Sequence, residues 1–192
     1  MAVVTIAGSP TANSRSTALL DLATQRLRGE GFRTRHIAVR ELPAAELLAA
    51  DTKQPAIADA LLAIEQASIV IVATPVYKAA YSGLLKSFLD LLPQTGLQGK
   101  AVLPIATGGS PAHLLALDYA LRPVLAALGA RVVIESLFVA DSQLNLAGGG
   151  IALAPEIQQR FDSALANLQE AYGWLTGDAA VAADIPFPAF AV

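Results

Sequence analysis

Short apolar runs alternate along this chain with longer segments of helical periodicity, and this alternation restricts the possible folds more than any other feature. Continuous apolar runs of strand length are typical of a parallel sheet that helices cover on both faces. The sequence predicts five strands, at residues 2–7, 33–39, 68–73, 101–106 and 131–139. It predicts five helices, at residues 16–29, 56–66, 83–92, 113–128 and 155–174. The chain is therefore expected to form one α/β domain.

Five strand–helix units favour a doubly wound sheet, either the five-stranded flavodoxin-like form or a truncated dinucleotide-binding form. Right-handed crossovers and the number of strands favour the flavodoxin-like order 2-1-3-4-5, with helices on both faces. In that order a ligand crevice opens at the carboxyl ends of the first, third and fourth strands. These ends lead into the loops at residues 8–15, 74–82 and 107–112.

Composition limits the surface and the partners of this domain. Of 192 residues, 54% are hydrophobic and 15% are charged, whereas an ordinary globular protein has about 25% charged residues. So little polar surface predicts a homo-oligomer. A net charge of -3 without a basic run argues against nucleic-acid binding. We expect the domain to span residues 1–177, followed by a proline-containing, non-helical tail at 178–192 that is frayed or packed on a neighbouring subunit.

The chain also lacks most side chains that perform catalysis unaided. It has no cysteine and only two histidines, which excludes disulfides, thiolate chemistry and a multi-histidine metal centre. No carboxylate pair or serine–histidine arrangement is expected at the crevice, so hydrolytic chemistry is disfavoured. The chemistry is therefore expected to come from a cofactor. Without a charged leader or an apolar stretch of about 18–20 residues, the chain is predicted to be cytoplasmic, with no membrane contact.

The loop after the first predicted strand has the composition of a phosphate site. It reads GSPTANSRS over residues 8–16, with four hydroxyls, one amide and one guanidinium just before a helix. Free N–H groups and the helix dipole attract anions at such a position. The loop lacks the Gly-Lys-Ser/Thr ending of a P-loop and the G-x-G-x-x-G pattern. Simple helix capping by Ser14 or Ser16 is the alternative, and it explains one hydroxyl of the cluster.

The other two loops could contact a flat ring. In the TPVYKAAYSG run at 74–83, two tyrosines could line a ring and Lys78 could meet a second phosphate, or the tyrosines could simply border the core. In the TGGSPAH run at 107–113, Gly108 and Gly109 allow close backbone approach, or they form a tight turn. His113 is either a ligand contact or a structural residue.

The helix predicted at 113–128 has two apolar faces. One stripe is expected to face the sheet and consists of Leu114, Leu117, Leu121, Leu125 and Leu128. A second strip consists of Leu115, Tyr119 and Ala126 and predicts contact with a partner subunit. Pro123 has no N–H to bond the carbonyl of Tyr119, so the helix should kink or bulge there.

Several of these segments together resemble the NADPH-dependent FMN reductase family. The resemblance lies in AGSP at 7–10 with SRS at 14–16, ATPVYKAAYSG at 73–83 and ATGG at 106–109. The runs HLLA at 113–116 and DYALRP at 118–123 are similar to flavin reductases of two-component alkanesulfonate monooxygenase systems. The likeness extends over about residues 3–141, and the tail adds nothing to it.

The resemblance implies an enzyme that transfers hydride from NADPH to FMN, a dissociable flavin, and supplies free reduced flavin to a monooxygenase that desulfonates organosulfonates. It implies that Ser9, Ser14, Arg15 and Ser16 hold the FMN phosphate. It places Pro75, Val76 and Tyr77 beside the ring and ribityl chain, and Thr107, Gly108 and Gly109 at the ring edge. Lys78, Ser110 and His113 are expected as further contacts. Many relatives have Pro-Glu-Tyr-Asn at 75–78, which leaves the roles of Val76 and Lys78 open.

The resemblance also implies a tetramer through the helix around Tyr119 and Pro123, where a π-bulge in similar reductases is linked to flavin release. An ordinary proline kink is the alternative. No metal site is expected. Three other functions stay open on the sequence: a quinone or azo reductase that retains FMN, a flavodoxin-type electron carrier, and a phosphate-binding or structural subunit without flavin.

Overall fold

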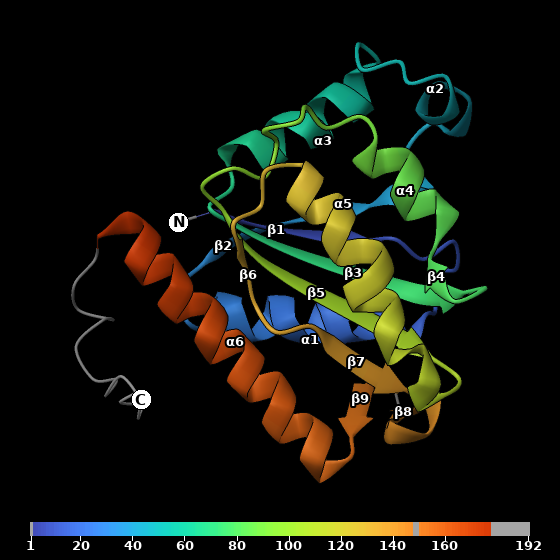
Figure 1. Cartoon of the computed structure of the whole chain (residues 1–192), viewed down its shortest axis with the longest axis vertical. Coiled ribbons are helices and arrows are strands. Elements are labelled where there is room, and N and C mark those ends of the chain that lie inside the picture. The colour runs from blue at the N-terminus through green and yellow to red at the C-terminus, as the bar shows by residue number, and fades with distance from the viewer. Residues whose placement is uncertain (1, 148–149, 178–192) are drawn as a thin grey trace, which may run out of the picture.

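The computed structural model describes residues 2–147 and 150–177, and they form a central sheet with helices on both faces (Figure 1). The strands of the sheet are parallel and lie in the order β2 (Arg33–Ala38), β1 (Ala2–Ala7), β3 (Ile69–Tyr77), β5 (Ala101–Gly108), then β6 (Val132–Val133) with β7 (Leu137–Ala140). Since β6 and β7 both pair with β5, they are two parts of the predicted fifth strand. The flavodoxin-like order 2-1-3-4-5 is confirmed.

The helices pack in two clusters, one on each face of the sheet (Figure 1). Leu19 and Leu20 of α1 (Arg15–Gly29) pack with Phe161 of α6 (Pro155–Thr176) in one fully buried cluster. The opposite cluster joins residues of α3 (Pro55–Gln66), α4 (Gly83–Leu89) and α5 (Arg122–Ala127). Because β3 and β5 are buried between both clusters, their sequences are almost wholly apolar.

Strand β3 is longer than the sequence predicts. Thr74 and Pro75 pair with Ala106 and Thr107 of β5, so the strand continues to Tyr77 instead of ending at 73. The chain then turns back as β4 (Ala80–Tyr81), antiparallel to the end of β3. The predicted strand-to-helix loop is therefore largely a hairpin, and α4 ends at Leu89, earlier than the predicted 92.

The predicted strand at 131–139 is interrupted between β6 and β7. Nη2 of Arg122 donates to the carbonyl of Val133 at 2.9 Å and to that of Ile134 at 3.2 Å. These bonds satisfy two carbonyls at the interruption, which reduces the cost of leaving the sheet there.

The segment predicted as a helix at 113–128 is helical through residue 127, but it is not a uniform α-helix. The segment begins as a 3-10 helix, η2 (Pro111–Leu114), passes through a π-helical turn, η3 (Leu117–Leu121), and ends as α5. The N–H of Arg122 reaches the carbonyl of Leu117, five residues back, just before Pro123. The 3-10 start changes the phase of the side chains, so Leu114 is 41% exposed and does not belong to the core stripe. The other four leucines of that stripe are buried as predicted.

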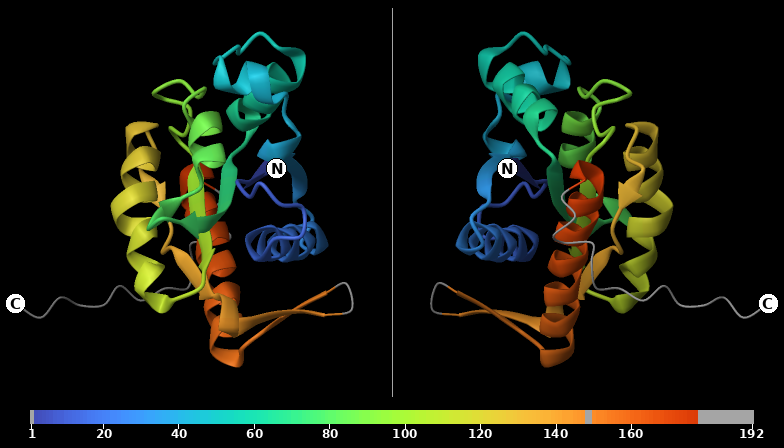
Figure 2. Two further views of the ribbon diagram at one scale, coloured as in Figure 1. Left: turned by 90° about the vertical axis from the view of Figure 1, so that its right-hand side faces the viewer. Right: turned by 90° about the vertical axis from the view of Figure 1, so that its left-hand side faces the viewer.

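Several elements have no counterpart in the sequence prediction. They are the 3-10 helix η1 (Val39–Glu41), the helix α2 (Ala44–Leu48), the 3-10 helix η4 (Asp141–Gln143) and the strands β8 (Leu144–Ala147) and β9 (Gly150–Leu153). The antiparallel pair β8–β9 extends from the domain as an arm (Figure 2). The tail expected at 178–192 lies outside the described residues.

Candidate functional site

The three predicted ligand loops leave neighbouring strands at one edge of the sheet. Strand β3 lies between β1 and β5, with Ala73 opposite Ala7 on one side and Ile105 on the other. The loops after these parallel strands therefore emerge side by side, as the predicted crevice requires.

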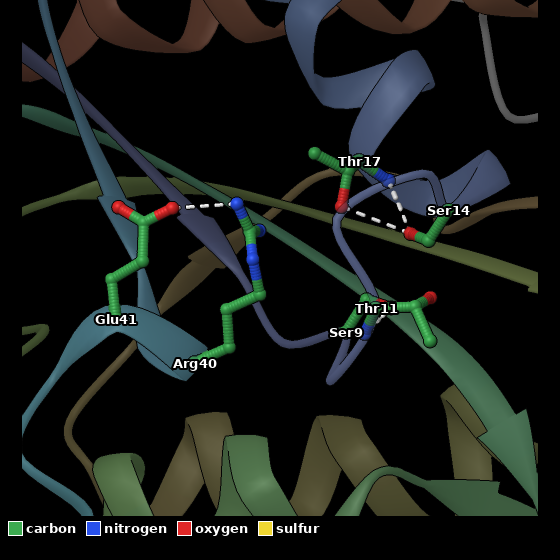
Figure 3. A network of polar contacts seen from close by, with 6 residues as sticks. All are labelled: Ser9, Thr11, Ser14, Thr17, Arg40 and Glu41. Atoms are coloured by element: carbon green, nitrogen blue, oxygen red, sulfur yellow. Dashed lines mark hydrogen bonds and ion pairs between the residues drawn. The ribbon is translucent and has the colours of Figure 1, made fainter.

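The loop after β1 is organised by its own hydroxyl groups (Figure 3). Ser9 is fully buried, and its Oγ lies 3.2 Å from Thr11 Oγ1 and accepts from the Thr11 N–H at 3.2 Å. These short-range hydrogen bonds hold the N–H groups and hydroxyls of the loop close together.

Ser14 is the N-cap of α1. Its Oγ accepts from the N–H of Thr17 at 3.0 Å and lies 3.0 Å from Ser16 Oγ and 2.9 Å from Thr17 Oγ1. Capping thus explains Ser14, but two further hydroxyls converge on the same atom. We call residues 8–17 the phosphate loop from here on.

Gly8 allows this loop to pack tightly against α4. A Cβ atom at Gly8 would lie 2.7 Å from Leu85 Cβ, which is too close for any side chain. The Gly8 carbonyl accepts a hydrogen bond from Ser82 Oγ, and its N–H donates to the Ala73 carbonyl at 2.8 Å. The first and second loops are therefore joined directly.

Two guanidinium groups stand near the phosphate loop. Arg15, the first residue of α1, is half exposed, and its Nη1 lies 3.6 Å from Oδ2 of Asp141. Arg40 follows β2, next to the end of β1, and bonds Glu41 Oε1 through Nη2 at 2.6 Å (Figure 3). Nη1 of Arg40 is buried and has no hydrogen-bond partner among the residues the structure describes.

The second loop presents its tip to solvent. Lys78 and Ala79 have φ angles of 50° and 63°, a strained left-handed conformation for residues with side chains. Tyr77 and Lys78 are exposed, whereas Pro75 and Val76 are half-buried toward the sheet. Burial raises the pKa of Tyr81, so this tyrosine remains a neutral phenol at physiological pH.

The third loop places backbone at the surface of the crevice. Gly108 is buried, and a Cβ atom there would lie 3.3 Å from both His113 Nδ1 and the Phe138 ring. His113 therefore packs against glycine backbone, and its buried Nδ1 has no partner within the described part of the chain. Gly109 is exposed, and Ser110 caps η2 by accepting from the Ala112 N–H at 3.3 Å.

The π-helical turn leaves large apolar side chains uncovered. Tyr119 is 78% exposed and Leu115 is 56% exposed, and Leu114 also reaches the surface. A single copy of the chain thus leaves this surface, which we call the π-turn surface, open to solvent.

The structure adds three residues that the sequence did not indicate: Thr17, Arg40 and Asp141. Thr17 completes the hydroxyl cluster, and its hydroxyl so close to a helix start was a usable signal. Arg40 was missed because it follows the second strand, whereas the sequence predicted the crevice at the ends of the first, third and fourth strands. Asp141 was missed because its partner, Arg15, is distant in sequence.

The arm β8–β9 forms one wall of a hollow beside the phosphate loop. This hollow is a cavity of about 640 Å³ between α1 and the arm, with Ser14 and Thr17 on one wall and Leu146 and Ile151 on the other.

Among residues 2–147 and 150–177, no cluster of three or more histidine, aspartate or glutamate side chains could hold a metal ion. Within these same ranges, no helix is long and apolar enough to cross a membrane.

Comparison with known proteins agrees with this geometry. The sequence profile described as NADPH-dependent FMN reductase matches residues 1–145. The chain is 47% identical to FMN reductase (NADPH) of Escherichia coli K12 over 171 residues, 89% of this chain and 90% of that protein. It is 36% identical to the NADH-dependent FMN reductase SfnF of Pseudomonas putida over 143 residues, covering 71% and 75% of the two chains. Among solved structures, the apo form of the NADH:FMN oxidoreductase EMOB superimposes with a TM-score of 0.81 at 43% identity and 88% coverage of both chains.

Proposed function

The chain belongs to the NADPH-dependent FMN reductase family, and from that premise we propose that it releases the flavin it reduces. It is an oxidoreductase that uses NADPH and FMN. In the proposal, FMN is a dissociable substrate, and free reduced flavin passes to a monooxygenase that acts on organosulfonates. The resemblance of residues 113–123 to reductases of alkanesulfonate monooxygenase systems supports this partner.

The observation that supports FMN as the flavin substrate is the phosphate loop. Its hydroxyls converge at the start of α1, and Arg15 stands half exposed at the first helical position. This donor set suits a phosphate monoester dianion, which accepts hydrogen bonds from hydroxyl, N–H and guanidinium groups. Ser9, Ser14, Arg15 and Ser16 would hold the FMN phosphate.

The neighbouring loops would hold the rest of the flavin. Residues 75–77 would lie beside the ring and ribityl chain, and Thr107 with residues 108–110 would border the ring edge. His113 would help by packing behind Gly108. When bound, the flavin accepts a hydride from the nicotinamide, and backbone N–H groups near its edge stabilise the negative charge.

Lys78 is our candidate for the NADPH phosphate at the ribose. It is exposed on the hairpin tip, and no ion pair joins it within the described ranges. The Lys78→Ala substitution should raise the KM for NADPH and leave the KM for NADH unchanged. The exposed Lys53, away from the crevice, gives the control Lys53→Ala. An equal change for both coenzymes would assign Lys78 another role.

We further propose that the π-turn surface pairs copies of the chain into a tetramer. Its exposed tyrosine and leucines would be covered there, and the π-helical turn beside the crevice would connect assembly with flavin release.

Purified protein tests the proposal when NADPH oxidation is measured with and without added FMN. We expect a nearly colourless protein after dialysis that oxidises NADPH only with added flavin. Adding an FMNH2-dependent alkanesulfonate monooxygenase should then release sulfite from an alkanesulfonate. A persistently yellow protein that reduces quinones without added FMN would contradict the proposal and indicate the retained-flavin alternative.

A further inference from the structure

We infer that Asp141 lowers the affinity of the site for flavin phosphate by competing for Arg15. This inference rests on the proposed function, in which Arg15 meets the FMN phosphate. Asp141 would act through its charge, by pairing with Arg15 and by repelling the phosphate dianion that Arg15 binds. Its role would be to keep FMN and reduced FMN exchangeable.

Asp141 occupies a place from which it can act on the phosphate loop. It directly follows β7, whose last residue, Ala140, pairs with Gly108 at the carboxyl edge of the sheet. The carboxylate oxygen lies 3.6 Å from Arg15 Nη1, and the two side chains are 42% and 47% exposed. The ion pair thus connects the phosphate loop with the strand beside the ring-edge loop.

The backbone around Asp141 is held firmly. The Ala140 N–H donates to Gln143 Oε1 at 3.0 Å, and the Gln143 carbonyl accepts from the Ala154 N–H at 2.9 Å. These bonds fix both ends of the arm β8–β9 next to Asp141. The backbone therefore keeps Asp141 next to the phosphate loop.

The ion pair is too long to orient Arg15 well. At 3.6 Å it lacks the geometry of a hydrogen bond, and both groups are partly in water, where such pairs contribute little to stability. The negative charge, however, repels a phosphate dianion held by the same guanidinium. The repulsion between Asp141 and the phosphate should therefore weaken FMN binding more than the contact between Asp141 and Arg15 strengthens it.

The same helix offers a matched control. Arg26 of α1 lies 3.8 Å from Asp162, with both side chains about half exposed, so this pair resembles the Arg15 pair in type and length. It lies along α1 well beyond the phosphate loop. Replacing Asp162 changes the net charge by the same amount without touching the site.

The test is a titration of Asp141→Asn with FMN and with riboflavin, which lacks the phosphate, at low and high salt. We expect FMN to bind about two- to fivefold more tightly at low salt, with a smaller gain at high salt and no change for riboflavin. Asp162→Asn should bind both flavins like the wild type, and Asp141→Glu should restore wild-type affinity.

Three results would overturn the inference: weaker FMN binding by Asp141→Asn, no effect of that substitution on FMN binding, or an equal change for both flavins. The variant Arg15→Gln separates this failure from failure of the phosphate site. If Arg15→Gln weakens FMN binding but Asp141→Asn has no effect, only the role of Asp141 is wrong. If Arg15→Gln also leaves FMN binding unchanged, the proposed phosphate site fails with it.

Discussion

The phosphate loop and the π-turn surface border the same edge of the sheet, yet they are built in opposite ways. In the phosphate loop, buried Ser9 and the N-cap Ser14 bond to neighbours within a few residues. On the π-turn surface, Tyr119 projects into solvent and the helix departs from α geometry. One chain completes the first region, whereas the second would gain contacts in the proposed tetramer. Binding of the flavin phosphate should therefore be a property of the monomer, and assembly should depend on the other region.

The largest effect is expected from Gly8→Ala, because Gly8 lies where the phosphate loop packs against α4. The new Cβ would lie 2.7 Å from Leu85 Cβ, an atom fixed close to the α4 backbone. Overpacking of this kind costs about 1–3 kcal/mol of unfolding free energy, and FMN binding should weaken as the loop shifts. Urea unfolding measures the loss. The control Gly83→Ala adds a Cβ with no atom within 4 Å and should leave stability unchanged.

Ser14 separates capping from phosphate binding. Ser14→Ala should cost about 1 kcal/mol of unfolding free energy because the Thr17 N–H loses its acceptor. Ser14→Asp should retain stability, since aspartate caps helices as well as serine does, but should repel the FMN phosphate. Thermal unfolding together with FMN titration distinguishes the two effects. If Ser14→Asp bound FMN normally, the hydroxyl cluster would serve only as a cap.

Tyr119→Ala should have a smaller effect on folding and a clear effect on assembly. Because the side chain is 78% exposed, its removal should change the unfolding free energy of the monomer by less than about 0.5 kcal/mol. Light scattering should show dissociation into smaller species, while FMN still binds. Trp174→Ala removes another exposed aromatic side chain, on α6, and should leave assembly intact. If both substitutions changed the oligomeric state equally, the π-turn surface would not be a specific contact between subunits.

The smallest effect is expected from His36 of β2, which pairs with Thr5 of β1. His36 Nδ1 lies 3.1 Å from Thr5 Oγ1, and partial desolvation by neighbouring residues lowers the pKa of this surface histidine below its ordinary value of 6.5. The folded state then binds fewer protons than the unfolded state, so stability is full above pH 6.5 and falls as the pH drops through the folded pKa. His36→Gln should reduce this slope in unfolding measured from pH 7 to 5. If His36→Gln left the dependence of stability on pH unchanged, other titratable groups would be its cause.

The sequence indicated the start of α1 and the hydroxyl-rich loop before it because their determinants are local. Hydroxyls, a guanidinium and a helix start fall within one short run, and the hydrogen bonds of Ser9 and Ser14 span two or three residues. The strand order was predictable for a similar reason, since buried parallel strands are recognisable as continuous apolar runs.

The features that could not be predicted depend on distant contacts. Pro123 indicated a disturbed helix, but the 3-10 start that exposes Leu114 follows from how residues 108–114 pack, with His113 against Gly108. The break in the fifth strand involves Arg122, and the environment of Arg15 involves Asp141. The arm β8–β9 was missed because three glycines at 148–150 interrupt its alternating pattern.

A paired titration of the wild-type protein with FMN and riboflavin shows whether the phosphate loop binds the phosphate of the flavin. The two ligands share the ring and the ribityl chain and differ only in the phosphate. If the phosphate loop holds that group through charge-assisted hydrogen bonds, FMN should bind about tenfold or more tightly than riboflavin. Equal affinities for the two flavins would contradict the account, because the loop would then make no contact with the phosphate.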